Sequence, residues 1–167
     1  NVGSGSHGRQ TAAMMEGIEE VIRKEQPDFL VIYGDTNSTL AGAVAAAKIG
    51  VPVAHIEAGL RSFNKSMPEE INRLCTDVLC DYLYTTDPIA DENLIKEGVA
   101  AEKIHFVGNV MIDTLMKHKL MAGRLKLRDN LGLKAGGYAT LTLHRPSNVD
   151  DKQVLQGILG ALQEIST

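Results

Sequence analysis

Three carboxylates, Asp35, Glu57 and Glu69, lie at sequence positions where an open α/β sheet places its chemistry. Each follows an apolar run or falls in the first turn of a predicted helix. In a doubly wound sheet the carboxyl ends of parallel strands share one edge, so residues far apart in the sequence line a single crevice there. Carboxyls crowded around one ligand are not all ionised equally, which gives one site both a general acid and a general base. The three residues together therefore indicate proton-transfer chemistry.

Each of these acids also has a structural interpretation. Asp35 directly precedes a predicted helix, and aspartate is a residue type that caps helices. Glu57 has Arg61 and Arg73 as candidate ion-pair partners. Glu69 follows a proline, and acids in the first helical turn are common, solvated and favoured by the helix dipole. For each acid taken alone, these alternatives stay open.

Two basic residues and a glycine-rich stretch could bind an anionic group. His144 ends the last predicted strand beside Arg145, where an imidazole donor suits an anionic leaving group, with a structural histidine as the alternative. Residues 3–8 precede a helix, a setting that holds phosphate, but no strand precedes them and the signal is weak. We predict no metal site, because the remaining histidines have no ligand-like spacing: His7, His55, His105 and His118.

Composition and length narrow the class of protein. The 167 residues suffice for one domain, or for one domain and part of a second. The 44% hydrophobic and 23% charged content is that of a globular protein, and the net charge of −4 argues against a nucleic-acid partner. No apolar run is long enough to span a bilayer and no signal peptide is visible, so we expect a cytoplasmic protein without a membrane partner. Cys75 and Cys80 suit neither a disulfide nor a zinc site, and we expect free thiols.

Helical and extended patterns alternate along the chain, which predicts an α/β protein with a Rossmann-like parallel sheet and flanking helices. The run 29–33 is apolar throughout and reads as a fully buried strand. Asp87 and Pro88 form an N-cap followed by proline at the first helical position. We predict strands at 29–33, 51–56, 81–85 and 104–107, and helices at 9–24, 38–49, from 68, from 88 and at 110–121.

The composition changes near residue 122. Residues 122–137 are rich in glycine, lysine and arginine and resemble a linker between domains. A strand at 138–143 and a helix from about 150 then begin a second domain. We expect a partial N-terminal domain at 1–121 and a truncated C-terminal domain at 138–167. The chain also opens without a methionine, so we expect a fragment of a longer protein.

Several strings of the sequence resemble one family, the UDP-N-acetylglucosamine (UDP-GlcNAc) 2-epimerases, and in particular its bacterial, non-hydrolysing branch. The strings occur in the order and spacing of that family over nearly the whole chain. They are GDTNST at 34–39, HIEAGLR at 55–61, PEEINR at 68–73, GNVMID at 108–113 and LHR at 143–145.

The resemblance implies two Rossmann-like domains in the glycosyltransferase-B arrangement, with the active site in the cleft between them. It implies interconversion of UDP-GlcNAc and UDP-N-acetylmannosamine (UDP-ManNAc) with no cofactor or metal. UDP is eliminated across C1 and C2 to leave a 2-acetamidoglucal, and it is added back with C2 inverted. Proton removal from C2 and protonation from the opposite face need acid and base groups on both sides of the sugar.

The resemblance also implies roles for individual residues. By this match the catalytic residues are Asp35, Glu57, Glu69 and, near the diphosphate, His144. Arg73 matches an arginine that supports the sugar or an acid, and we expect Arg61 and Arg145 to contact substrate as well. The family's first strand with its Gly-x-Arg-Pro-Glu loop and most of its second domain have no match here, so we expect the chain alone to be inactive.

Four alternatives to this function remain. They are the hydrolysing branch, a relative acting on a diacetamido sugar, a glycosyltransferase of the same fold, and a non-catalytic nucleotide-sugar-binding half-domain.

Without the family's first strands, the strand at 29–33 has an open edge, a hazard for a lone chain. We expect this edge to pair with the strand at 138–143 or with another chain, and we expect a homodimer.

Overall fold

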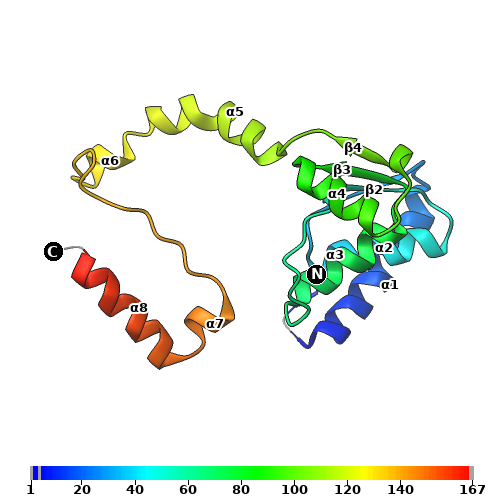
Figure 1. Ribbon diagram of the computed structural model, residues 1–167, viewed down its shortest axis with the longest axis horizontal. Coiled ribbons are helices and arrows are strands. Elements are labelled where there is room, and N and C mark those ends of the chain that lie inside the picture. The colour runs from blue at the N-terminus through cyan, green and yellow to red at the C-terminus, as the bar shows by residue number, and fades with distance from the viewer. Residues whose placement is uncertain (1, 4, 166–167) are drawn as a thin grey trace. The chain divides into compact units, whose positions relative to one another are not determined.

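The computed structural model describes residues 2–3 and 5–165 of the chain. They form two compact units, Asn1–His118 and Lys119–Thr167. The first unit contains the parallel sheet and the helices around it (Figure 1). Its strands are β1 (Leu30–Tyr33), β2 (Val53–Ala58), β3 (Tyr82–Thr85) and β4 (Ile104–Phe106), and its helices are α1 (His7–Glu25), α2 (Asn37–Lys48), α3 (Pro68–Leu79), α4 (Pro88–Lys96) and the 3₁₀ turn Ala101–Lys103.

The four strands form one parallel sheet in the order β1-β2-β3-β4. Each consecutive pair is connected through a helix, as parallel strands require. The predicted helices and strands of this unit are present within a few residues of their expected bounds, and the parallel α/β architecture is confirmed. Because all four strands run the same way, their carboxyl ends meet at one edge of the sheet.

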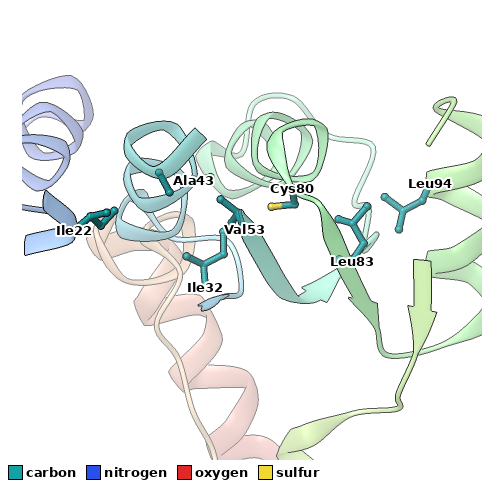
Figure 2. Packing of buried hydrophobic residues seen from close by; sticks show 9 residues of the cluster. Ile22, Ile32, Ala43, Val53, Cys80, Leu83 and Leu94 are labelled. Atoms are coloured by element: carbon teal, nitrogen blue, oxygen red, sulfur yellow. The ribbon is translucent and has the colours of Figure 1, made fainter. Parts of the chain in front are cut away.

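The core lies on one face of this sheet. Ile32, Val53 and Leu83, from three neighbouring strands, form one buried cluster with Ile22 of α1 and Leu94 of α4, and Figure 2 shows Leu83 beside Leu94. The small residues of α2 let that helix pack closely: a Cβ added at Gly42 would lie 3.2 Å from the Cγ2 atom of Ile32. Ala41, Ala43, Ala45 and Ala46 of the same helix are buried.

The prediction that residues 29–33 form a fully buried strand was wrong. Ile32 is buried, but Val31 is 41% exposed and Tyr33 is 60% exposed. Side chains alternate between the two faces of a strand, and the core cluster covers only the face that carries Ile32. The strand does lie at an edge of the described sheet, and pairing of that edge with another chain stays a prediction.

Helix starts follow the residues expected to set them. The Asp87 side chain accepts a hydrogen bond from the backbone N–H of Ala90 at 3.1 Å, with Pro88 next in sequence, so the predicted N-cap is confirmed. Thr36 caps α2, and its hydroxyl forms a capping box with Thr39. These caps fix where α2 and α4 begin at the carboxyl edge of the sheet.

The second unit is mainly helical. Helix α5 (Val110–Arg124) runs into it from the first unit, and α6 (Leu127–Asn130), α7 (Pro146–Val149) and α8 (Lys152–Ile165) follow. The predicted strand at 138–143 was wrong, because these residues form no strand. A strand needs a neighbour to pair its backbone groups, and the described part of this unit contains none. No helix among the described residues is long and apolar enough to cross a bilayer.

The two cysteines should differ sharply in reactivity. Both are free, as expected, with Cys75 exposed and Cys80 buried. Burial and the nearby Asp77 and Asp81 carboxylates raise the pKa of the Cys80 thiol to about 12, so little reactive thiolate forms. We expect iodoacetamide at neutral pH to label Cys75 and to leave Cys80 unmodified until urea is added. Equal labelling of both residues in the folded protein, read by peptide mass spectrometry, would contradict this.

Candidate active site

The three predicted acids lie at the same edge of the sheet. Asp35 follows β1, Glu57 lies near the end of β2, and Glu69 lies in the first turn of α3. Helix α3 reaches back to the first of these sites, because the Asn72 side chain donates to the backbone carbonyl of Asp35 at 2.8 Å. Residues that are distant in the sequence are thereby placed along one edge.

Asp35 is held by an arginine. The Arg73 guanidinium donates to the Oδ2 atom of Asp35 from Nε at 3.0 Å and from Nη2 at 2.7 Å. The Asp35 side chain remains 31% exposed, so it can still meet a ligand. Thr36 supplies the cap of α2, so the helix-capping interpretation of Asp35 was wrong.

Glu57 has an unusual backbone conformation. Its φ angle is +72°, in the left-handed region, and the β2–β3 register shifts between Ile56 and Ala58. Glu57 is thus the extra residue of a β-bulge, a device that turns a side chain away from its normal direction. Such a conformation costs a non-glycine residue about 1–3 kcal/mol and is concentrated at functional sites. A Cβ added at Gly34 would lie 3.6 Å from the Oε2 atom of Glu57, so this carboxylate lies beside the residue before Asp35.

The two adjacent glutamates of α3 have different environments. Glu69 is half-buried and lies four residues before Arg73, on the same side of the helix. Glu70 is buried and accepts hydrogen bonds from the backbone N–H groups of Ser62 and Phe63, both at 2.9 Å. It also pairs with Arg73 at 2.6 Å. Glu70 therefore anchors the loop before α3, and the role of Glu69 in a site stays a prediction.

A cavity of about 440 Å³ adjoins these acids between α1, α2 and α3. Its volume falls within the usual range for ligand pockets. Asn72, which contacts Asp35, and Pro68, which precedes Glu69, line its wall. The three acids themselves are not among its lining residues, so the cavity neighbours them only through Asn72 and Pro68.

Arg61 has a structural environment. Its side chain is 1% exposed and pairs with Asp77 at 2.8 Å and with Glu97 at 2.6 Å. Burial alone would lower the pKa of Arg61, but hydrogen bonds and charge from Glu97 and Asp77 outweigh it and raise that pKa. The two carboxylates occupy the guanidinium, so this geometry favours an internal role over the expected contact with substrate.

His144 and Arg145 lie in the second unit, and both are exposed there. Arg145 is the N-terminal flanking residue of α7. Their approach to the acids stays a prediction. Of the glycine-rich stretch at 3–8, Ser4 lies outside the described residues, and the phosphate-binding interpretation also stays a prediction.

Comparison with known proteins shows which family the chain belongs to. A family model described as UDP-N-acetylglucosamine 2-epimerase matches residues 1–167. The chain belongs to the UDP-N-acetylglucosamine 2-epimerase family. The resemblance read from the sequence strings is thus confirmed.

Individual relatives of this epimerase family are similar over nearly the whole chain. A UDP-N-acetylglucosamine 2-epimerase from Methanococcus maripaludis is 45% identical over 99% of the chain and 46% of its own length. A UDP-2,3-diacetamido-2,3-dideoxy-D-glucuronate 2-epimerase from Pseudomonas aeruginosa is 48% identical over the same shares. The crystal structure of the Methanocaldococcus jannaschii UDP-GlcNAc 2-epimerase, in complex with UDP-GlcNAc and UDP, superposes with a TM-score of 0.86 at 45% identity, over 99% of this chain and 46% of that one. The Rossmann-like fold is confirmed, and the chain spans about half the length of these epimerases.

The anchor residue Glu70 should make the fold of this chain sensitive to acid. Burial alone would raise the Glu70 pKa, but hydrogen bonds from Ser62, Phe63 and Arg73 outweigh it and lower that pKa below its ordinary value of 4.5. The folded state thus binds this proton less readily than the unfolded state, so the stabilisation is present above about pH 4.5 and is lost as the pH falls further. We expect the free energy of unfolding in urea to fall below that pH, with a shallower fall in Glu70→Gln. Identical pH slopes in both proteins would contradict this.

Proposed function

We propose that the whole protein interconverts UDP-GlcNAc and UDP-ManNAc without releasing UDP into solution. The observation that carries this proposal is the placement of Asp35, Glu57 and Glu69 along one edge of the sheet, in a member of this family. The names of several relatives support the same substrate. Inversion at C2 needs groups that remove and return a carbon-bound proton, and carboxyls of this kind can do both.

The proposed reaction has two halves. A carboxylate removes the C2 proton, the C2–H electron pair forms a C1–C2 double bond, and the bond from C1 to the UDP oxygen breaks. UDP leaves with the electron pair of the broken C1–O bond, and a 2-acetamidoglucal remains. In the second half the UDP oxygen attacks C1 while an acid delivers a proton to C2 from the opposite face. Protons and charges balance over the cycle, so no outside oxidant or reductant is needed.

The three acids differ in their contacts. Asp35 pairs with an arginine, whereas Glu57 and Glu69 have no side-chain partner among the described residues. Arg73 fixes the Asp35 carboxylate and keeps a cation beside it. Within the described residues, the Glu57 and Glu69 carboxylates accept no hydrogen bond from another side chain. Their lone pairs are thus available to a substrate, and their partial burial suits proton transfer. We propose that all three acids face the sugar, with Arg73 supporting Asp35.

We assign the charged diphosphate to the second half of the site. In the proposed complex, His144 and Arg145 bind the diphosphate and stabilise the charge that develops on UDP as it leaves. A guanidinium pairs with phosphate oxygens through two parallel hydrogen bonds, and a ring N–H of histidine adds a third donor.

Product analysis with the full-length protein tests this function. Incubation with UDP-GlcNAc should produce UDP-ManNAc up to an equilibrium mixture, observed by proton NMR of the anomeric signals. Formation of free UDP and N-acetylmannosamine in equal amounts would instead identify the hydrolysing alternative and contradict the proposal.

A second substrate is favoured by one specific observation. The relative named UDP-2,3-diacetamido-2,3-dideoxy-D-glucuronate 2-epimerase is 48% identical, as similar as the relatives named for UDP-GlcNAc. Comparing kcat/KM for the two UDP-sugars decides between them. We expect UDP-GlcNAc to have the higher value, and the reverse order would assign the protein to the diacetamido sugar.

We also propose that the protein is a homodimer in the cytoplasm. The exposed free thiol of Cys75 suits a reducing compartment. Sedimentation analysis of the full-length protein should give twice the monomer mass, and cell fractionation should recover it with cytoplasmic markers. A monomer at micromolar concentration would contradict the first part.

A further inference from the structure

A buried histidine of β2, the strand that carries Glu57, contacts the backbone just before Asp35. The His55 side chain is fully buried within β2, and the proposed reaction does not use it. Its Nε2 atom lies 2.7 Å from the carbonyl oxygen of Gly34, the residue before Asp35. Its Nδ1 atom lies 2.6 Å from the Oδ1 atom of Asp77 in α3. Both ring nitrogens thus have an oxygen partner.

These partners require a hydrogen on each ring nitrogen. A carbonyl oxygen only accepts, so Nε2 of His55 donates to Gly34. The second oxygen of Asp77 accepts from the backbone N–H of Gly59 at 3.1 Å and pairs with Arg61 at 2.8 Å, which is the environment of an ionised carboxylate. An ionised carboxylate also only accepts, so Nδ1 of His55 must donate to it. The geometry fits an imidazolium.

The charge balance of the cluster supports the same protonation state. Asp77 and Glu97 are its anions and Arg61 is a cation, which donates to both oxygens of Glu97 at 2.8 and 2.6 Å. The side chains of His55, Asp77 and Arg61 are no more than 1% exposed. An unbalanced charge in such a place is costly. The Glu97 side chain is 32% exposed, so solvent screens part of its charge, and a protonated His55 brings the four side chains together to neutrality.

The cluster of His55, Asp77 and Arg61 also contacts the backbone beside Asp35 and the backbone beside Glu57. Gly34 precedes Asp35, and Gly59 lies two residues after Glu57. The two glycines and Glu57 have φ angles of +62°, +78° and +72°, so this part of the chain depends on tertiary contacts to keep its shape. Asn93 adds a hydrogen bond to the carbonyl oxygen of Gly59 at 2.9 Å. His55 contacts one side directly and the other side through Asp77.

We propose that His55, as an imidazolium, is a positioning residue that sets the spacing between Asp35 and Glu57. This inference rests on the proposed function, because that function gives both acids a role in proton transfer. The ring contacts the backbone beside Asp35 and reaches the backbone beside Glu57 through Asp77, so it acts on the acids only by placing them. A displacement of about 1 Å at a reacting group can cost about 10²-fold in rate. Loss of the ring should therefore affect the chemical step more than substrate binding.

The kinetic test compares His55→Gln with His105→Gln in the full-length protein. His105 also lies in a strand, but its ring packs against the rings of Tyr82 and Tyr84, and its side chain forms no hydrogen bond to a carboxylate within the described residues. We expect His55→Gln to lower kcat about 10- to 100-fold while KM for UDP-GlcNAc changes less than about threefold. His105→Gln should keep the wild-type values. An unchanged kcat in a folded His55→Gln protein would overturn the proposal.

Histidine ring NMR of the wild-type protein provides the second measurement. At about pH 7, both ring nitrogens of His55 should carry a hydrogen. A single protonated nitrogen overturns the proposal whatever the kinetics show. Where His55→Gln does not fold, Asp77→Asn takes its place, with the same expected loss of kcat, and an unchanged kcat in that variant also overturns the proposal. If neither variant folds, the network is structural and the positioning role is rejected.

The outcomes also separate this inference from the proposed function. A wild-type protein that does not epimerise rejects the function and the positioning role together. An active wild-type protein with a singly protonated His55, or with an unaffected His55→Gln variant, rejects only the positioning role.

Discussion

Replacing Glu57 by glutamine in the full-length protein is expected to lower kcat for UDP-GlcNAc epimerisation by about 10²- to 10⁴-fold, the usual contribution of a group that transfers a proton. Glutamine is nearly isosteric but can neither take nor give the proton. The Glu57 carboxylate accepts no hydrogen bond from a side chain in the described part of the chain, so its loss should leave stability almost unchanged. Steady-state kinetics and a urea unfolding curve measure both quantities.

Two further variants show whether this loss comes from the carboxylate. Glu92→Gln changes an exposed glutamate that pairs with Lys96 on the surface of α4, and it should keep wild-type kcat. Glu57→Gly should lose the same activity yet raise stability by about 1 kcal/mol, because glycine adopts a positive φ without strain. Wild-type turnover in Glu57→Gln would remove this residue from the catalytic set.

Replacing Gly59 by alanine is expected to destabilise the first unit by about 3 kcal/mol or more. The added Cβ would lie 2.5 Å from the carbonyl oxygen and 2.9 Å from the carbonyl carbon of Ala90, which are backbone atoms of α4. The φ angle of +78° is also unfavourable for alanine. Relief of the clash requires movement of α4 or of the chain after Glu57. A lower urea midpoint by circular dichroism checks this result.

Gly17→Ala is the matched control for that substitution. Gly17 lies inside α1, and a Cβ added there meets nothing within 4 Å. Alanine should therefore stabilise the helix by about 0.5–1 kcal/mol through helix propensity. Equal effects of the two substitutions would show that the close approach of α4 to Gly59 does not constrain the fold.

Much of the fold followed from local patterns. Each strand of the first unit has an apolar run, and Asp87 with Pro88 marks the start of α4 as expected. The burial of β1 was overestimated because an apolar run does not reveal that only one face of a sheet is covered. The strand at 138–143 was predicted from residue types alone, although a strand also needs a partner for its backbone groups.

The site was predictable to the extent that it depends on the carboxyl ends of strands. Asp35 and Glu57 follow from that rule, but the bulge at Glu57 does not, because it is a shift in the register between β2 and β3, which lie far apart in the sequence. The different environments of Glu69 and Glu70 could not be predicted from the sequence either, since both lie in the same helical turn. The spacing of three residues from Glu70 to Arg73 was the available signal for that ion pair.

Exchange of the C2 proton is the most direct test of the proposed mechanism. The full-length protein is incubated with UDP-GlcNAc in deuterated water, and the recovered UDP-sugars are analysed by NMR and mass spectrometry. The proposed mechanism predicts one deuterium at C2 of the UDP-ManNAc formed, and label in UDP-GlcNAc as the reaction approaches equilibrium. Turnover or binding of UDP-GlcNAc without label at C2, as expected for a glycosyltransferase or a non-catalytic binding protein, would contradict it.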